Sequence, residues 1–288
     1  MPPWLKRPLP AGDDFVQTGK VLSRLGLNTI CREASCPNIG ECWARRIATF
    51  LVLGSQCTRG CRFCNVGSGK PQPVDSTEPA RVAQAVKELG LVHVVITMVT
   101  RDDLPGGGAE HVSRVLDAVH QRCPETSIEF LSSDFKGNWE VLPGVLHSGV
   151  DIWGHNMETV PRLYEQARPG ADYQRSLELF RRLHGLDSRL ALKSGLMLGL
   201  GESLDEVIEV LKDLRSVNVD RVTLGQYLAP TERHLPVREF IPPELFEELA
   251  AKAADMGFQI VESHPFARSS YYSPEHAKQL FPAGNKKE

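Results

Sequence analysis

Three things are missing from this sequence of 288 residues: a long apolar run, a large charge of one sign and an apolar segment at the N-terminus. The longest strongly apolar stretch, residues 91–100, is far shorter than the roughly 20 residues that span a bilayer. A formal net charge of −3 gives no electrostatic reason to bind nucleic acid. The residues before position 9 lack the apolar core of a signal peptide. We therefore expect a cytoplasmic protein with neither a membrane nor a nucleic acid as partner.

Cysteine is not abundant either, but its distribution is uneven. Hydrophobic residues make up 41% of the chain and charged residues 24%, values that exclude a disordered protein. Of the seven cysteines, six fall between positions 31 and 64, and Cys123 stands apart, where we expect a packing residue. A chain of this length builds its own core and needs no disulfide framework. The clustered cysteines therefore indicate metal or redox chemistry.

Short β-branched runs alternate with amphipathic helical patterns from residue 48 onward. They predict strands at residues 48–53, 92–98, 127–132, 150–154, 190–198 and 221–228. They predict helices at residues 79–90, 109–122, 173–186, 203–217 and 242–257. Ser203 and Glu206 form a capping-box pattern, and Gly90 and Gly257 stand where helices should end. Repeated βα units of this kind specify a parallel sheet, either open or closed toward a barrel.

Polar residues recur just after the expected strands, at the edge where barrel enzymes carry their chemistry. These loops contain residues 57–64, 100–103, 133–135, 155–158, 199–202 and 227–230. The pattern favours an α/β barrel over residues 48–257. Residues 1–47 then form an N-terminal extension and residues 258–288 a C-terminal extension, which we expect to cover the barrel ends.

Cys57, Cys61 and Cys64 have the spacing C-x3-C-x2-C in a glycine-containing loop, compact enough to direct three sulfurs at one centre. Iron–sulfur clusters usually take four cysteine ligands, so three ligands leave one iron open to a substrate or cofactor. A structural zinc site more often has paired C-x2-C units with four ligands. Spacing and position together favour an iron–sulfur cluster.

The octapeptide Cys-Thr-Arg-Gly-Cys-Arg-Phe-Cys at residues 57–64 resembles the signature of radical S-adenosylmethionine enzymes. The resemblance implies that its three cysteines hold a [4Fe–4S] cluster whose open iron binds S-adenosylmethionine. One electron from that cluster then cleaves the cofactor to methionine and a 5′-deoxyadenosyl radical. The resemblance also implies a partial (β/α)6 TIM-type barrel, which agrees with the six expected strands.

Cys31, Cys36 and Cys42 form a second triplet, C-x4-C-x5-C, again one ligand short. Alone, these cysteines are also compatible with structural zinc. Beside the first triplet they resemble the auxiliary cluster motif of the lipoyl synthase family, which implies that Ser270 supplies the missing ligand to a second [4Fe–4S] cluster. Arg32 departs from that family's pattern, where we expect an acidic residue in many members. The resemblance continues at residues 3–6, 101–105, 155–160, 193–202, 225–228 and 268–271.

Six further residues are expected at the cofactor by the same resemblance. Asn156, Glu158 and Arg168 should hold the ribose and carboxylate of S-adenosylmethionine, and Phe63 should present its backbone to the adenine. Thr100 and Asp134 follow expected strands and should also contact the cofactor. On the residues alone, without the cysteines, the pattern favours Asn156 and Glu158 as helix caps and Arg168 as a partner in a surface ion pair.

The family resemblance implies insertion of two sulfur atoms at C6 and C8 of a protein-bound octanoyl-lysine, with two molecules of S-adenosylmethionine consumed. The carrier is then a lipoyl carrier domain or the glycine cleavage H protein, docked on the two extensions. An electron donor such as ferredoxin or flavodoxin and an iron–sulfur carrier that rebuilds the auxiliary cluster are further expected partners. We expect no catalytic side chain beyond the cluster ligands, since radical hydrogen abstraction needs positioning and exclusion of water. Two alternatives stay open: a radical enzyme that acts on a small molecule, and a zinc-stabilised binding module.

Overall fold

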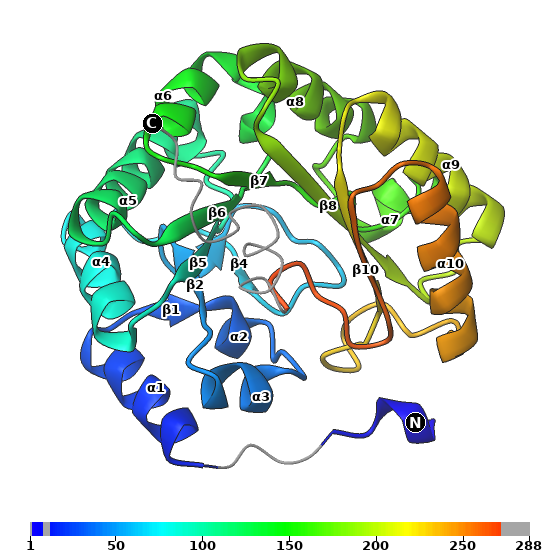
Figure 1. The fold of residues 1–288 in the computed structure, drawn as a ribbon, viewed down its shortest axis with the longest axis horizontal. Helices are drawn as coiled ribbons and strands as arrows, with labels where there is room; N and C mark the ends of the chain where they lie inside the picture. The colour runs from blue at the N-terminus through cyan, green and yellow to red at the C-terminus, as the bar shows by residue number, and fades with distance from the viewer. Residues whose placement is uncertain (1, 8–11, 272–288) are drawn as a thin grey trace.

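The computed structural model of the protein describes residues 2–7 and 12–271, which form a central sheet with helices around it (Figure 1). In the described residues the main sheet has eight strands, in the spatial order β1-β2-β5-β6-β7-β8-β9-β10. They are β1 (Asn28–Thr29), β2 (Thr49–Val52), β5 (His93–Met98), β6 (Ser127–Leu131), β7 (Ile152–Gly154), β8 (Ala191–Leu198), β9 (Arg221–Gln226) and β10 (Ile260–Ser263). β1 is antiparallel to β2, and all other neighbouring pairs are parallel. Two short parallel strands, β3 (Gln56–Cys57) and β4 (Gly67–Ser68), form a separate pair.

Helices alternate with the parallel strands and form the outer ring seen in Figure 1. They are α4 (Glu78–Leu89), α5 (Ala109–Arg122), α6 (Leu142–His147), α8 (Tyr173–Leu186), α9 (Leu204–Ser216) and α10 (Pro243–Asp255), with the short α7 (Tyr164–Ala167) before α8. The N-terminal region adds α1 (Asp13–Arg24), α2 (Ile30–Glu33) and α3 (Ile39–Ala44). Single 3-10 turns lie at Pro3–Leu5, Pro105–Gly108, Phe135–Gly137, Trp139–Val141 and Pro161–Leu163. No helix in the described part of the chain is both long and apolar enough to cross a membrane.

Local sequence explains why these elements begin and end where they do. α9 begins with the expected capping box, in which Ser203 and Glu206 each satisfy the other's backbone N–H. α4 ends at Gly90, whose φ of 64° is the left-handed conformation that glycine adopts without strain. All six residues of β5 are buried, as expected for a parallel strand covered on both faces. Every expected strand and helix is present, with ends within two residues of the prediction.

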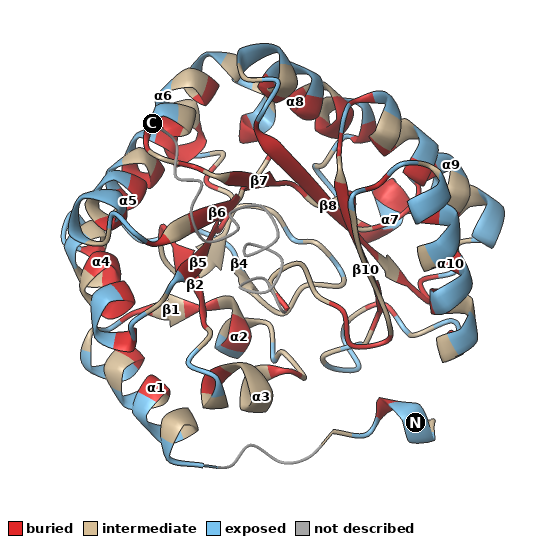
Figure 2. Cartoon of the chain, viewed as in Figure 1, coloured by how far each residue is buried: buried red, intermediate tan, exposed pale blue. Residues whose placement is uncertain are grey.

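The predicted partial (β/α)6 barrel is confirmed by this arrangement. Figure 2 shows buried residues on the strands and on the inner faces of the helices, and exposed residues on their outer faces. Two strands lie outside the predicted repeat: β1 extends one edge of the sheet and β10 the other. They come from the two extensions, so each extension adds a strand to one edge of the sheet. Residues 1, 8–11 and 272–288 of those extensions lie outside the described residues.

The two extensions contact each other beside the barrel, next to α2 and α3 (Figure 1). The Asn38 side-chain amide donates a hydrogen bond to the Phe266 carbonyl at 2.8 Å. Arg7 donates to the Tyr271 hydroxyl at 3.1 Å and to the Glu41 carboxylate at 2.8 Å. Residues from opposite ends of the sequence therefore form one structural unit around the second cysteine triplet.

Candidate functional site

Cys57 ends β3, and Cys61 and Cys64 lie in the loop between β3 and β4. This loop lies beside the carboxyl end of β5, where the Thr58 N–H donates to the Thr100 carbonyl at 2.9 Å. The Cys64 N–H donates to the Cys61 carbonyl at 3.1 Å, which closes the turn that carries both residues. Burial raises the pKa of the Cys64 thiol to about 12, and Cys61 and Cys57 are close enough to add to this rise. Burial also raises the pKa of Cys61, with a contribution from Cys57. Ionising these buried thiols is unfavourable unless a bound cation compensates their charge.

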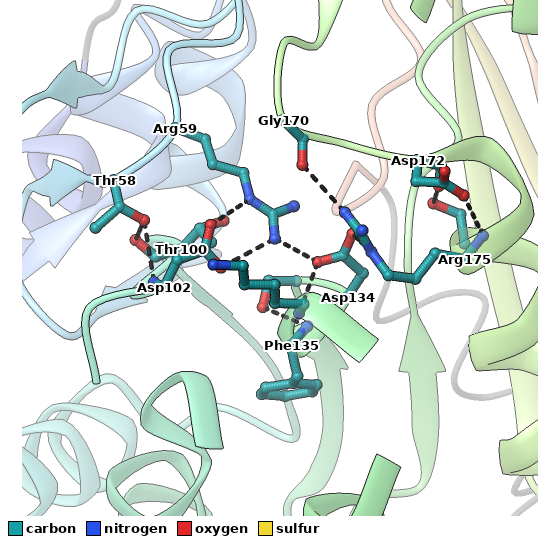
Figure 3. A network of polar contacts seen from close by, with 12 residues as sticks. Thr58, Arg59, Thr100, Asp102, Asp134, Phe135, Gly170, Asp172 and Arg175 are labelled. Atoms are coloured by element: carbon teal, nitrogen blue, oxygen red, sulfur yellow. Dashed lines mark hydrogen bonds and ion pairs between the residues drawn. The ribbon is translucent and has the colours of Figure 1, made fainter. Parts of the chain in front are cut away.

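Arg59, inside this loop, fixes it to the ends of two neighbouring strands (Figure 3). Its guanidinium donates to both carboxylate oxygens of Asp102, at 2.8 and 3.0 Å, and to Asp134 at 2.6 Å. The Arg59 side chain is only 7% exposed. Such a bidentate, buried pair determines the orientation of both partners. The loop is therefore held by the strand ends that follow β5 and β6.

Asp134, expected at the cofactor, has both carboxylate oxygens engaged by arginines. Oδ1 accepts from Arg59, and Oδ2 accepts from Arg175 of α8 at 2.7 Å. Burial acts to raise the pKa of this carboxyl, but the hydrogen bonds and charge of Arg59 outweigh it and hold the pKa well below its usual range. Figure 3 shows Arg175 also reaching the Gly170 carbonyl. In this structure Asp134 joins the cysteine loop to α8.

Asn156, Glu158 and Arg168, which are expected to hold the ribose and carboxylate of the cofactor, lie together beside the first cysteine loop. The Asn156 amide donates to the Glu158 carboxylate at 3.1 Å. Arg168 donates to the main-chain carbonyls of Asn156 and Met157, each at 2.9 Å. Burial raises the pKa of Glu158, and the positive charge of Arg168 only partly offsets this. The Arg62 N–H donates to the Ala167 carbonyl at 2.9 Å, which sets Arg168 beside the first cysteine loop. The charges of Arg168 and Glu158 both act on the pKa of Cys61.

Arg168 and Glu158 each have a feature that fits a bound cofactor. Arg168 Nε is buried and has no hydrogen-bond partner among the described residues, so it is available to a carboxylate. Glu158 has a φ of 68°, a conformation that costs a non-glycine residue about 1 kcal/mol or more. Strain of this kind is often found in residues that bind ligands. The residues present therefore fit the cofactor that the sequence predicts.

Thr100 and Phe63 are the remaining expected cofactor residues. The Thr100 carbonyl accepts from the Thr58 N–H at 2.9 Å and from its hydroxyl at 3.0 Å, so that it braces the cysteine loop. The Phe63 side chain is partly buried and packs against the core, and its main chain lies in the sequence between Cys61 and Cys64. Both residues lie at the predicted edge of the barrel.

The second triplet and Ser270 surround one pocket of about 320 Å³, counted with its open mouth. Residues lining it include Cys31, Cys36, Cys42, Arg268 and Ser270. Burial raises the pKa of Cys31 to about 11, with a contribution from Cys36, and that of Cys42 to about 12, with contributions from both other cysteines. The structure therefore brings a serine from the C-terminal extension to three cysteines from the N-terminal one, the donor set predicted for the auxiliary cluster.

The chemistry of these donors fits an iron–sulfur cluster. Three thiols and one serine hydroxyl line the pocket, and iron–sulfur clusters usually take four protein ligands, most often cysteines. All seven cysteines are free thiols in this structure, so each of the three is available as a ligand.

Several polar residues around the two triplets carry no local signal in the sequence. Arg59 and Arg175 find their shared acidic partner, Asp134, in a loop distant in the sequence, and Arg7, Glu41 and Tyr271 meet across almost the whole chain. Lys193 is different, because a lysine inside an apolar strand predicts a buried partner. That partner is Glu129 of β6.

Comparison with known proteins identifies the family. The model of the Radical SAM superfamily matches residues 51–214. Lipoyl synthase of Geobacter metallireducens is 52% identical over 279 residues, which cover 97% of this chain and 98% of the relative. Lipoyl synthase of Caldicellulosiruptor saccharolyticus is 49% identical over 277 residues, with 96% and 97% covered. The chain belongs to the lipoyl synthase family. The predicted function as a lipoyl synthase and the predicted enzyme class, a radical S-adenosylmethionine sulfurtransferase, are thereby confirmed.

Membership of the lipoyl synthase family also confirms [4Fe–4S] clusters and S-adenosylmethionine as cofactors. It sets aside the alternative of a zinc-stabilised module without catalysis. Among solved structures, methylornithine synthase (PylB) is similar with a TM-score of 0.55 and 14% identity, covering 94% of each chain. HydG, a maturase of the [FeFe]-hydrogenase, has a TM-score of 0.57 and 13% identity, covering 92% of this chain and 73% of its own. At such identities the similarity is one of fold.

Proposed function

We propose that this lipoyl synthase family member inserts two sulfur atoms at C6 and C8 of an octanoyl chain carried on a lysine of another protein. One observation supports this above all: the chain has two separate, incomplete cysteine triplets, and Ser270 lies in the pocket of the second. One site to make a radical and one to supply sulfur are what this reaction requires. The comparison with curated relatives supports the same reaction.

In this proposal Cys57, Cys61 and Cys64 hold the radical-forming cluster, and Cys31, Cys36, Cys42 and Ser270 hold the auxiliary cluster. When bound, the clusters and S-adenosylmethionine supply the electron, the radical that abstracts hydrogen, and the sulfur. The high pKa values of Cys31 and Cys42 mean that thiol protons must leave as the auxiliary cluster binds.

Asn156, Glu158 and Arg168 are proposed to hold S-adenosylmethionine, and Thr100 and Phe63 to line its site. Arg168 would contact the cofactor carboxylate through its unpartnered Nε, and Glu158 would accept hydrogen bonds from the amino group or the ribose. Asp134 is not proposed to contact the cofactor itself, since both of its carboxylate oxygens are held by Arg59 and Arg175. Its proposed part is to keep the cysteine loop in place for the cofactor.

The carrier is proposed to be a lipoyl carrier domain or the glycine cleavage H protein, docked where the extensions 1–47 and 258–288 meet. This place lies beside the auxiliary pocket, so a lysine arm would enter close to the sulfur source. We further propose ferredoxin or flavodoxin as electron donor, an iron–sulfur carrier for cluster rebuilding, and the cytoplasm as location. Cytoplasmic conditions keep thiols reduced, as seven free cysteines require.

The test is an anaerobic assay of the reconstituted protein with octanoylated carrier domain, S-adenosylmethionine and a reductant, followed by mass spectrometry of the carrier. We expect a gain of two sulfur atoms with loss of two hydrogens. A matched reaction with free octanamide tests the alternative of a small-molecule substrate. Cofactor cleavage without sulfur on the carrier, or sulfur on the free amide alone, would show that the proposed substrate is wrong.

A further inference from the structure

The segment of residues 268–271, Arg-Ser-Ser-Tyr, touches both cysteine sites. Ser270 lines the pocket of the second triplet. Ser269 points the other way and donates its hydroxyl to Asn156 Oδ1 at 2.9 Å, at the proposed S-adenosylmethionine site. Tyr271 is held by hydrogen bonds with Arg7 and Glu41. The residues on both sides of Ser270 are thus anchored, one to the barrel and one to the N-terminal extension.

Lys193 provides the barrel anchor from inside the sheet. It lies on β8 and is 4% exposed, where an unpaired ammonium group would be very costly. Two hydrogen bonds go to the Glu129 carboxylate, at 2.9 and 3.2 Å. A third goes to the main-chain carbonyl of Ser269. The three contacts match the three N–H donors of a lysine, so its position determines where the Ser269 main chain lies.

Two glycines of the barrel make room for this segment. A Cβ on Gly195 of β8 would stand 3.0 Å from Asn156 Oδ1 and 3.1 Å from Ser269 Oγ. A Cβ on Gly225 of β9 would stand 2.1 Å from the Ala267 carbonyl oxygen. Any larger residue at position 225 would displace the segment. The sheet is therefore shaped to receive it.

Asn156 completes the connection to the first triplet. Its amide oxygen accepts from Ser269 while its NH₂ donates to Glu158, so both ends of the amide are used. Removal of the Ser269 hydroxyl would leave the Asn156 oxygen without this partner and free the amide to rotate. The same hydroxyl therefore influences Glu158 on one side and the main chain before Ser270 on the other.

We propose that Ser269 and Lys193 are positioning residues that link the serine ligand of the auxiliary cluster to the S-adenosylmethionine site. The inference rests on the proposed function, in which Ser270 is that ligand. Because coupling between two sites is reciprocal, the contacts that orient Asn156 for the cofactor also orient Ser270 for the auxiliary cluster. Loss of either positioning residue should alter the properties of both sites.

The primary test compares Ser269→Ala with Ser216→Ala, an exposed serine at the end of α9 that serves as control. S-adenosylmethionine affinity is measured by calorimetry on anaerobically reconstituted protein. The electron paramagnetic resonance spectrum of the auxiliary cluster is recorded with Cys57, Cys61 and Cys64 replaced by alanine. For S269A we expect the dissociation constant for S-adenosylmethionine to rise about threefold to tenfold, as for the loss of one hydrogen bond. We also expect the g-values of the auxiliary cluster to shift toward those of Ser270→Ala. S216A should change neither.

A second variant tests Lys193 without leaving an unpaired charge in the sheet. Lys193→Met alone would leave the Glu129 carboxylate buried without its cationic partner, so it is combined with Glu129→Gln. We expect this double variant to reproduce the spectral shift of S269A, since the Ser269 carbonyl loses its anchor. Its folding is checked by circular dichroism, and S269A, which removes only a hydroxyl, gives an independent answer.

The outcomes separate this inference from the function on which it rests. If S270A shifts the auxiliary spectrum but S269A and the double variant leave it unchanged, the link is wrong and the ligand role stands. If S269A weakens cofactor binding without a spectral change, Ser269 belongs to the cofactor site alone and the link is again wrong. If S270A itself leaves the spectrum unchanged, both the ligand role and the link are wrong.

Discussion

Arg59 and Asp134 form a buried ion pair, with 2.6 Å between Nη2 and Oδ1, that ties the first cysteine loop to the strand end after β6. Asp102 and Arg175 also bind this pair (Figure 3), and the Arg59 N–H donates to Cys57 Sγ at 3.4 Å, so the network fixes one side of the proposed cofactor site. A reaction that generates a radical depends on such fixed geometry, because misplacement by even an ångström can cost a hundredfold in rate.

Asp134→Ala should destabilise the fold and weaken the first cluster. The Arg59 guanidinium is 7% exposed and would lose one of its two acidic partners, which costs about 3 kcal/mol. Urea denaturation measures this loss, and iron analysis of the reconstituted protein measures the cluster. Glu178→Ala, which removes exposed pairs on α8, is the control and should cost less than about 1 kcal/mol. Equal effects of the two variants would contradict the structural role of Asp134.

Cys36→Ala and Cys61→Ala should separate the two halves of the reaction. C36A should abolish sulfur insertion yet keep some cleavage of S-adenosylmethionine, since the first triplet is intact. C61A should abolish both. Chromatography of 5′-deoxyadenosine and mass spectrometry of the carrier measure the two products. Full lipoyl product from C36A would show that the roles of the triplets are assigned wrongly.

Arg168→Met should weaken the binding of S-adenosylmethionine, and this loss of affinity should be larger than any loss of folding stability accounts for. A hydrogen bond to a charged group contributes about 1.5 to 3 kcal/mol, so the dissociation constant for S-adenosylmethionine should rise about tenfold to a hundredfold. Arg162→Met, which removes an exposed arginine paired with Glu206, is the matched control. Unchanged affinity in R168M would remove Arg168 from the cofactor site.

The Glu129 carboxyl should make stability fall in acid. Burial acts to raise its pKa, but the charge of Lys193 and a contact with His93 outweigh burial and lower it from 4.5 to about 2. The unfolded chain then binds the proton more readily, so this stabilisation is complete above about pH 4.5 and is lost as the pH falls toward 2. Urea midpoints of the cluster-free chain, measured from about pH 5 down to about pH 2.5, should show this slope. Glu129→Gln with Lys193→Met should flatten it, and an equally steep slope in that variant would assign the effect to other carboxyls.

Gly225→Ala should impair the auxiliary site while leaving the first triplet intact. The new Cβ would meet the Ala267 carbonyl oxygen at 2.1 Å, which forces the segment with Ser270 to move. We expect a cost of about 1 to 3 kcal/mol and loss of auxiliary iron. Gly185→Ala in α8, where nothing lies within 4 Å, is the control and should retain both clusters. Normal iron content in G225A would show that the segment can shift without harm to the site.

The repeated βα pattern was predictable because each strand and helix carries its own periodicity and caps. The capping box at Ser203 and the stop at Gly90 need only a few neighbouring residues. β1 and β10 were not predicted, since each is short and gains its stability from an existing sheet edge. The position of Lys193 inside an apolar strand indicates that a buried acidic partner must exist, but it does not identify Glu129 as that partner.

The sequence by itself determined the two cysteine spacings and the barrel that presents them, because both depend on residues close together along the chain. The family resemblance of the sequence implied that Ser270 joins Cys31, Cys36 and Cys42, and the tertiary structure brings them to one pocket. Only the tertiary structure decided that Arg59 pairs with Asp134 and that Ser269 reaches Asn156. These contacts join residues distant in sequence, and their energies depend on burial and orientation that the folded sheet creates. No local pattern encodes them.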